Sequence, residues 1–173
     1  GGIVGEDGVT HHGVFDMAAF GAVPGLTIAA PMDELELRNM MYTGLQYGHP
    51  FMIRYPRGNG AGRLWRGVPF EALPVGRGRR LREGTDVALV TVGTVGNAAD
   101  RAAERAAEKG VSVAHYDLRF AKPLDEALLA EVGAEFRHVV TVEDGSLRGG
   151  VGEAVTAFFN ARGCEVAVHS LGI

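Results

Sequence analysis

The chain has 173 residues, 46% of them hydrophobic, and a formal net charge of −4 at pH 7. This length allows one or two domains with a substantial buried core. The acidic balance argues against nucleic acid as the main partner, because the one basic run, residues 77–82, is short.

Other features of the composition suit a protein of the cytoplasm. No stretch reads as a signal peptide or a transmembrane helix, so we expect no membrane partner. The single cysteine, Cys164, excludes an internal disulfide, supports no metal cluster and fits a reducing compartment. We expect Cys164 to be a small buried apolar residue.

Residues 6–16 concentrate polar chemistry: three carboxylates, two imidazoles and a hydroxyl. The Asp7-Gly8 pair predicts a turn, and Gly13 permits close backbone approach. His11 is the candidate for proton transfer, because imidazole titrates near neutral pH, and Asp7 could fix its orientation. The same residue types suit a surface or helix-capping cluster, so spacing alone leaves both interpretations open.

Residues 16–57 have the pattern of a β-α-β unit. The apolar run 26–30 predicts one strand and residues 51–53 predict a second. Between them, Asp33 can cap a helix, and Glu36, three residues later, completes a capping box.

Two arginines follow the second of these strands. Arg54 and Arg57 come where the strand ends, at the edge where open parallel sheets bind ligands. Guanidinium groups match phosphate oxygens through two parallel hydrogen bonds. Each arginine taken alone equally suits a surface ion pair.

The rest of the chain predicts a linker and a second unit. Residues 58–84 are rich in Gly and Arg and lack periodicity, which predicts a linker. From residue 85, strand and helix alternate, which predicts parallel pairing in a compact α/β domain. The expected strands are 86–92, 111–116, 138–142 and 165–171, and the expected helices are 97–109, 125–134 and 150–162.

Two glycine-rich stretches join strands to helices, residues 93–97 and 145–152. Each could offer backbone amides to a phosphate. Neither matches a dinucleotide fingerprint or a P-loop, so we interpret both as tight turns.

Both ends of the chain have sequences typical of internal segments of a longer protein. The chain begins without methionine on the strand-like stretch 1–5. It stops on another strand-like stretch, 166–173, without a polar tail. We therefore expect a piece of a longer protein.

The string 7–16, Asp-Gly-Val-Thr-His-His-Gly-Val-Phe-Asp, resembles the active-site loop of the transketolase superfamily. Further matches follow in the same order, at residues 30–34, 54–59, 117–125 and 142–145. The resemblance covers essentially the whole chain and implies an α/β fold. The implied parts are the later part of a pyrimidine-binding domain (1–57), a linker (58–84) and a C-terminal domain with a largely parallel sheet, truncated at its end (85–173).

The Gly-Val-Phe-Asp ending of the loop is most similar to one branch of the superfamily. That branch condenses pyruvate with D-glyceraldehyde 3-phosphate to give CO₂ and 1-deoxy-D-xylulose 5-phosphate, a precursor of isoprenoids, thiamine and pyridoxal. The resemblance implies thiamine diphosphate and Mg²⁺ as cofactors, bound mainly by a missing N-terminal portion, and a homodimer. We expect no cofactor or metal ligand within this chain, which alone should be inactive.

The same resemblance gives roles to individual residues. His11 matches the active-site histidine, and Asp7 matches the acidic residue that contacts the hydroxyl or carbonyl region of the acceptor. Thr10 belongs to the supporting loop. Arg57 matches the arginine that holds the substrate phosphate.

Two other interpretations stay open. The first is another thiamine-diphosphate enzyme, such as a transketolase or the beta subunit of a 2-oxo-acid dehydrogenase. The second is a non-catalytic subunit that kept the fold. The Phe15-Asp16 ending favours the synthase branch, and the joint presence of the loop and phosphate candidates speaks against a non-catalytic role. We expect Arg54 to be structural and His12 not to be catalytic.

Overall fold

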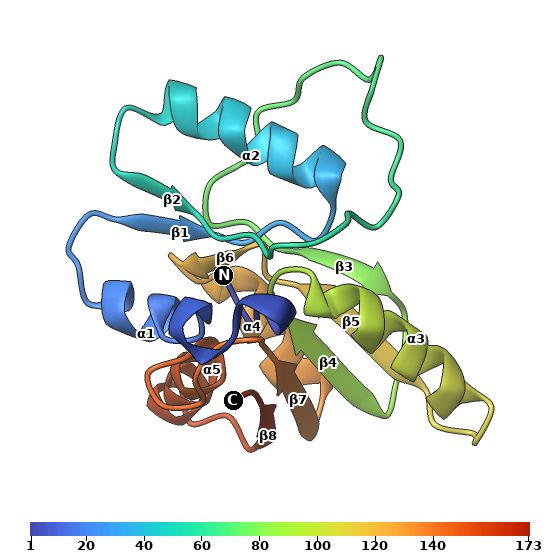
Figure 1. The fold of residues 1–173 in the computed structure, drawn as a ribbon. Coiled ribbons are helices and arrows are strands. Elements are labelled where there is room, and N and C mark those ends of the chain that lie inside the picture. The colour runs from blue at the N-terminus through green and yellow to red at the C-terminus, as the bar shows by residue number, and fades with distance from the viewer.

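The computed structural model describes all residues, 1–173, and contains two sheets (Figure 1). The strand order is β2-β1-β6 in the smaller sheet and β3-β5-β4-β7-β8 in the larger one. The strands are β1 Thr27–Ala29, β2 Phe51–Ile53, β3 Arg79–Arg82, β4 Val87–Thr91, β5 Val113–Asp117, β6 Phe120–Lys122, β7 His138–Val142 and β8 Ala167–Leu171. The helices are the 3₁₀ turns η1 Gly5–Asp7 and η2 Val9–His11, then α1 Asp16–Gly21, α2 Glu34–Tyr47, α3 Val95–Ala107, α4 Glu126–Glu135 and α5 Val151–Ala161.

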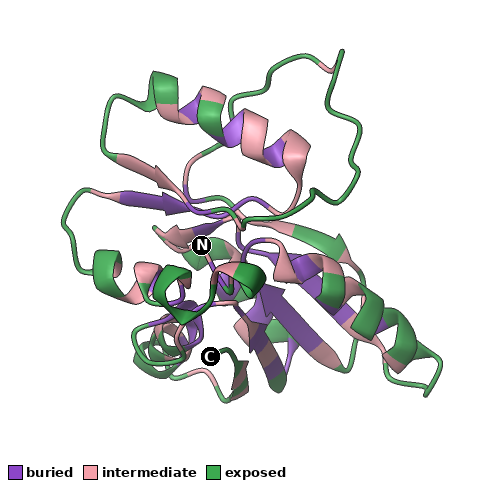
Figure 2. Cartoon of the chain, viewed as in Figure 1, coloured by how far each residue is buried: buried purple, intermediate pink, exposed green.

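The larger sheet is a parallel β5-β4-β7-β8 core with one antiparallel edge strand, β3. Alternate residues of a strand point to opposite faces. Leu89 of β4 packs with Ala99 and Ala103 of α3. Val90, the next residue, belongs to the cluster formed with α4 and α5. Helices therefore cover both faces, and β4 is almost wholly buried between them (Figure 2). The predicted parallel α/β domain is confirmed.

The smaller sheet contains the predicted β-α-β unit. β1 and β2 pair in parallel and α2 connects them. Asp33 caps α2, since its Oδ1 accepts a hydrogen bond from Glu36 N at 2.8 Å. α2 ends at Tyr47 and is followed by Gly48, whose φ of 71° lies in the left-handed region that glycine adopts at low cost.

The third strand of this sheet, β6, comes from residues 120–122, well after the predicted linker. β6 pairs antiparallel with β1 and places Phe120 in the core beside Ala29 and Met40. The three-residue length of β6 is too short to show a period in the sequence. The smaller sheet therefore includes a strand from residues that follow the predicted linker.

The predicted linker also needs correction. Residues 79–82 lie within the range 58–84 but form β3, which pairs with β5. Three of the four residues of β3 are arginines, so no apolar alternation marked it as a strand. Charged side chains are typical of an exposed sheet edge. The domain boundaries themselves stay a prediction.

The remaining linker is held against α2. Arg38 donates hydrogen bonds to the carbonyl oxygens of Trp65, Val68 and Pro69 at 2.7, 2.8 and 2.8 Å. Its guanidinium also lies 4.5 Å from the ring centre of Phe70. Arg38 thus holds residues 65–69 of this segment, which has no secondary structure.

The predicted helices and strands after residue 85 are present, with bounds shifted by a few residues. Cys164 is half-buried and packs against the main core cluster, so its apolar role is confirmed but full burial is not. No helix has the length and apolar character needed to cross a membrane.

His115 of β5 is a fully buried imidazole. Its Nε2 lies 2.9 Å from Thr91 Oγ1, and its Nδ1 lies 3.4 Å from Asp100 Oδ1. Burial lowers the pKa of His115 and outweighs the attraction of Asp100, while Arg82 and Arg79 lower it further. His115 therefore takes up a proton less readily in the folded protein than an ordinary histidine does.

We expect the full-length protein to lose thermal stability as the pH falls below the ordinary histidine value of 6.5. In that range the unfolded chain binds a proton at this histidine more readily than the folded chain does, so acid favours unfolding. The measurement is the unfolding midpoint at pH 7.5 and at lower pH for the wild type and His115→Gln. An equal acid dependence in both proteins would remove His115 as its source.

Candidate functional site

The polar stretch near the start of the chain forms a closed loop. Gly2 and Gly13 exchange two backbone hydrogen bonds of 3.0 and 2.9 Å, which join the two ends of the loop. Between them, η1 and η2 meet at Gly8, whose φ is +73°. A Cβ on Gly13 would lie 3.0 Å from Gly1 Cα, so a side chain there would force the ends apart. The predicted close approach at Gly13 is confirmed.

The two histidines of the loop have different surroundings. His11 is exposed, and its Nδ1 lies 3.0 Å from Thr10 Oγ1. His12 is half-buried, and its Nδ1 accepts a hydrogen bond from Val4 N at 3.0 Å. His12 therefore stabilises the loop, whereas His11 is directed by Thr10 and keeps its other ring nitrogen free.

Asp7 does not orient His11, contrary to the expectation from spacing. No hydrogen bond joins the two side chains, and Asp7 forms an ion pair with Arg57 instead. Two candidates 50 positions apart in the sequence are thereby brought together. The side chain of Arg57 is 65% exposed and that of Asp7 is 26% exposed, so the pair is open to an approaching ligand.

Arg54, by contrast, is a buried anchor. Its side chain is 3% exposed and donates from Nε to Asp16 at 2.8 Å, and it also pairs with Asp144. It donates further to the carbonyl oxygens of Asp144 and Gly13 at 3.0 and 3.3 Å. Burial alone would lower the pKa of Arg54, but Asp144 and Asp16 raise it. One side chain thus ties β2 to the base of the loop, to α1 and to the segment after β7.

Replacing Arg54 by methionine should lower the free energy of unfolding by about 3 kcal/mol, because it leaves two carboxylates without their partner. Urea unfolding of the full-length variant measures this. The control is Arg137→Met, whose ion pair with Glu165 is 73% and 85% exposed and should contribute less than about 1 kcal/mol. Equal losses in the two variants would contradict the anchoring role.

Two hollows flank Arg57. One, of about 410 Å³, lies toward the loop and includes Gly1, Val4 and Asp16 in its lining. The other, of about 620 Å³, lies between the two units and is lined by residues after β1 and β2, by the start of α2 and by the start of α3. Tyr55, Pro56 and Arg57 line both. The carboxyl ends of the parallel strands therefore open onto hollows, as expected for α/β folds.

The sequence-based interpretation missed part of the larger hollow. Asn97 and Arg101 of α3 line it, although they belong to the other unit. The only local sign that this segment could line a site was the glycine-rich stretch 93–97. This stretch forms a tight turn after β4 and does not match a nucleotide-binding fingerprint. No group of three or more His, Cys, Asp or Glu side chains in the chain is placed to hold a metal ion.

The fold and the loop are those of the transketolase family, and the chain belongs to it. The model for the pyrimidine-binding domain of transketolase matches residues 1–62, and the model for the C-terminal domain of transketolase matches residues 76–173. The resemblance noted in the sequence is confirmed.

Among curated relatives, the chain is similar to 1-deoxy-D-xylulose-5-phosphate synthases. It is 55% identical to the synthase of Bacteroides fragilis and 53% identical to that of Bacteroides thetaiotaomicron, over 99% of its own length. Identity to the synthase of Carboxydothermus hydrogenoformans is 44%. The chain spans 27% of the length of each of these relatives.

Two solved structures show the same fold. A chain of a split-gene transketolase, described as an inactive beta4 tetramer, has a TM-score of 0.85 and 28% identity, with 95% of this chain and 54% of that chain covered. A transketolase from Pichia stipitis has a TM-score of 0.69 and 20% identity, with 98% of this chain and 24% of that chain covered.

Proposed function

We propose that this chain forms part of a thiamine-diphosphate-dependent synthase that condenses pyruvate with D-glyceraldehyde 3-phosphate. The products are 1-deoxy-D-xylulose 5-phosphate and CO₂. The observation that carries the proposal is the contact between Asp7 and Arg57, which unites two separated motifs at one open edge of the fold. The 55% identity to a synthase of that name supports this choice of substrates.

Arg57 binds the phosphate of the aldehyde in this proposal. Its guanidinium is exposed between two hollows and its present partner is a single carboxylate. A phosphate matches the guanidinium fork and replaces Asp7. Binding energy from this remote group then positions the aldehyde carbon for reaction.

Asp7 and His11 act on the reacting end of the substrate. Once the phosphate occupies Arg57, the Asp7 carboxylate is free to accept a hydrogen bond from a substrate hydroxyl. His11, held at Nδ1 by Thr10, donates a proton from Nε2 to the oxygen that becomes negative when the new carbon–carbon bond forms. Thr10 serves this step by fixing the plane of the ring.

Thiamine diphosphate, when bound, supplies the carbanion chemistry that links a unit from pyruvate to an aldehyde. The diphosphate and its Mg²⁺ ion need further protein groups, and this chain spans only 27% of the length of the B. fragilis relative. We therefore assign that part of the site to an N-terminal portion of a longer polypeptide.

The working protein in this proposal is a homodimer of that longer polypeptide, and this chain alone is inactive. The chain covers 27% of the B. fragilis relative, which leaves most of such a protein outside it. The related split-gene transketolase chain, described as an inactive tetramer, offers a parallel for a part that folds without turning over.

The test is CO₂ release from pyruvate by the full-length protein with thiamine diphosphate and Mg²⁺, with and without D-glyceraldehyde 3-phosphate. We expect release to rise sharply with the aldehyde and a phosphorylated ketose to accumulate. No release under either condition would reject the synthase and favour another donor or a subunit without chemistry.

A further inference from the structure

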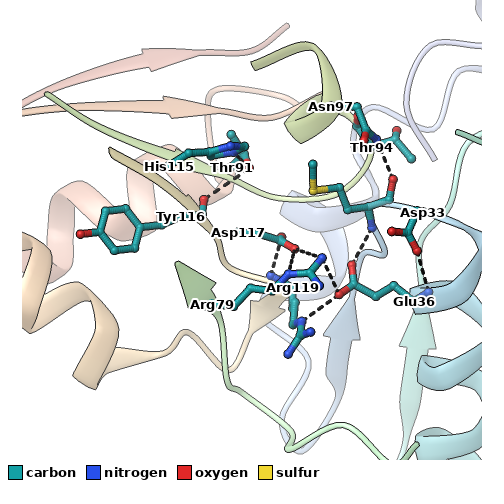
Figure 3. Close-up of polar contacts among 11 residues, drawn as sticks. Asp33, Glu36, Arg79, Thr91, Thr94, Asn97, His115, Tyr116, Asp117 and Arg119 are labelled. Carbon is teal, nitrogen blue, oxygen red and sulfur yellow. Dashed lines mark hydrogen bonds and ion pairs between the residues drawn. The ribbon is translucent and has the colours of Figure 1, made fainter. Parts of the chain in front are cut away.

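Glu36 is a buried carboxylate in the first turn of α2 that contacts both units of the fold (Figure 3). Only 4% of its surface is exposed. Its Oε2 accepts a hydrogen bond from Met32 N at 2.8 Å. Its Oε1 lies 2.8 Å from Arg119 Nε and 2.9 Å from an amino nitrogen of Arg79. The predicted capping box is therefore only half formed: Asp33 accepts from Glu36 N, but Glu36 accepts from Met32 N and not from Asp33 N. Capping of α2 does not account for the contacts of Glu36 with the two arginines.

Both arginines are fixed in turn by Asp117 at the end of β5. Arg79 donates to Asp117 Oδ2 from Nε at 3.1 Å and from an amino nitrogen at 3.0 Å. The backbone N–H of Arg119 donates to Asp117 Oδ1 at 3.0 Å. Arg119 has a φ of 58°, a conformation that costs energy for any residue but glycine. The strained backbone presents the Arg119 side chain to Glu36 across the unit boundary.

The contacts of Glu36 reach the larger hollow through Met32. The N–H of Met32 is held by Glu36, and its carbonyl oxygen accepts a hydrogen bond from Asn97 Nδ2 at 2.7 Å. Both backbone polar groups of Met32 are therefore hydrogen-bonded, the N–H to a carboxylate and the carbonyl oxygen to an amide. Met32 and Asn97 line the hollow of about 620 Å³ that Arg57 also lines.

A neighbouring carboxylate secures the segment that follows Arg57. Glu34 accepts hydrogen bonds from Gly62 N at 2.8 Å and Arg63 N at 3.3 Å. Backbone N–H donors, its own before that of Gly62, lower the pKa of Glu34. The start of α2 thus holds the chain on the far side of Arg57, and Arg54 anchors it on the near side.

We propose that Glu36 is a positioning residue for the phosphate-binding residue Arg57. Through Glu36, the C-terminal unit fixes the position of Arg57. Arg79 and Arg119 lock the start of α2 to the second sheet, and that start fixes the walls of the hollow around Arg57. This inference rests on the proposed function. It assigns to the C-terminal unit a part in recognising the phosphorylated substrate.

The test is Glu36→Gln in the full-length protein with its cofactors. Glutamine keeps the size and one carbonyl oxygen but loses the charge that holds two guanidinium groups. We expect the KM for D-glyceraldehyde 3-phosphate to rise about tenfold, corresponding to 1.4 kcal/mol, with the KM for pyruvate unchanged. Inhibition by inorganic phosphate, measured against the aldehyde, should weaken by the same factor. An unchanged KM for the aldehyde, or equal rises for both substrates, would overturn the proposal.

Asp125→Asn is the matched control for general loss of stability. Asp125 is also a buried carboxylate, but it caps α4 and accepts from Gly78 N at 3.0 Å, away from the hollow. The Asp125→Asn variant should have a lower unfolding midpoint and unchanged KM values for both substrates. If Glu36→Gln does not fold, Arg119→Lys keeps the charge and removes the Nε contact with Glu36, and it should show the same split between the substrates in smaller degree.

A double variant separates positioning from other effects. In the Arg57→Ala background, Glu36→Gln should add nothing to the KM for the aldehyde, because residues that act through one group are not additive. Additive effects would show that Glu36 acts by another route. If the wild type forms no phosphorylated ketose, the proposed function itself fails, whereas a normal wild type with unaltered Glu36→Gln kinetics rejects only this inference.

Discussion

The His11→Ala variant of the full-length protein is expected to have a kcat lowered by about 10²- to 10⁴-fold, the usual contribution of a general acid. His11 is exposed, and its one recorded hydrogen bond is to Thr10 in the same loop. The unfolding midpoint should therefore stay close to that of the wild type. Steady-state turnover with both substrates and a thermal scan measure the two quantities.

His49→Ala is the control for His11. It removes another exposed imidazole, which contacts Tyr47 edge to face at a ring distance of 5.2 Å and lies outside the loop and both hollows. Its turnover should equal that of the wild type. If His11→Ala turns over at the wild-type rate, the histidine is a bystander, and the cluster is a surface feature of the kind that composition alone allowed.

Arg57→Ala should raise the KM for D-glyceraldehyde 3-phosphate about 10- to 100-fold, the loss expected for a charge-assisted hydrogen bond. The KM for pyruvate should not change, because pyruvate carries no phosphate. The ion pair of Arg57 with Asp7 is largely exposed, so its loss should affect stability little. Initial rates over a matrix of both substrate concentrations separate the two KM values.

Arg105→Ala is the matched control for charge. Arg105 is exposed in the last turn of α3 and lines neither hollow. Its removal changes the net charge of the protein equally and should leave both KM values unchanged. Equal rises for both substrates in Arg57→Ala would mean that the arginine supports the site as a whole and does not clamp a phosphate.

Local chemistry made the main elements predictable. The apolar runs at 87–91 and 138–142, the Asp33 cap and the Ala-rich helix α3 each carry their pattern within a few residues. The turn at Asp7-Gly8 likewise depends on adjacent residues, whereas the partners of Gly13 in its close approach, Gly1 and Gly2, came only from the structure. These features could be read because the interactions that produce them span one or two turns of the chain.

Two strands, β3 and β6, could not be predicted in this way. β6 has three residues and β3 is mostly arginine, so neither shows a hydrophobic period. Both are strands because a partner with free backbone groups lies beside them: β1 for β6 and β5 for β3. Their state is decided by tertiary pairing, which a local pattern does not record.

The sequence by itself determined the α/β class, the order of the main helices and strands, and the residues Asp7, His11 and Arg57 as candidates. Only the tertiary structure decided that Asp7 faces Arg57 rather than His11, and that Glu36 reaches Arg119, 83 positions further on. Such ion pairs depend on where the backbone brings two side chains, and charged residues at these separations leave no spacing to recognise. The physical reason is that propensity and capping act between neighbours, whereas electrostatic partners are chosen by the completed fold.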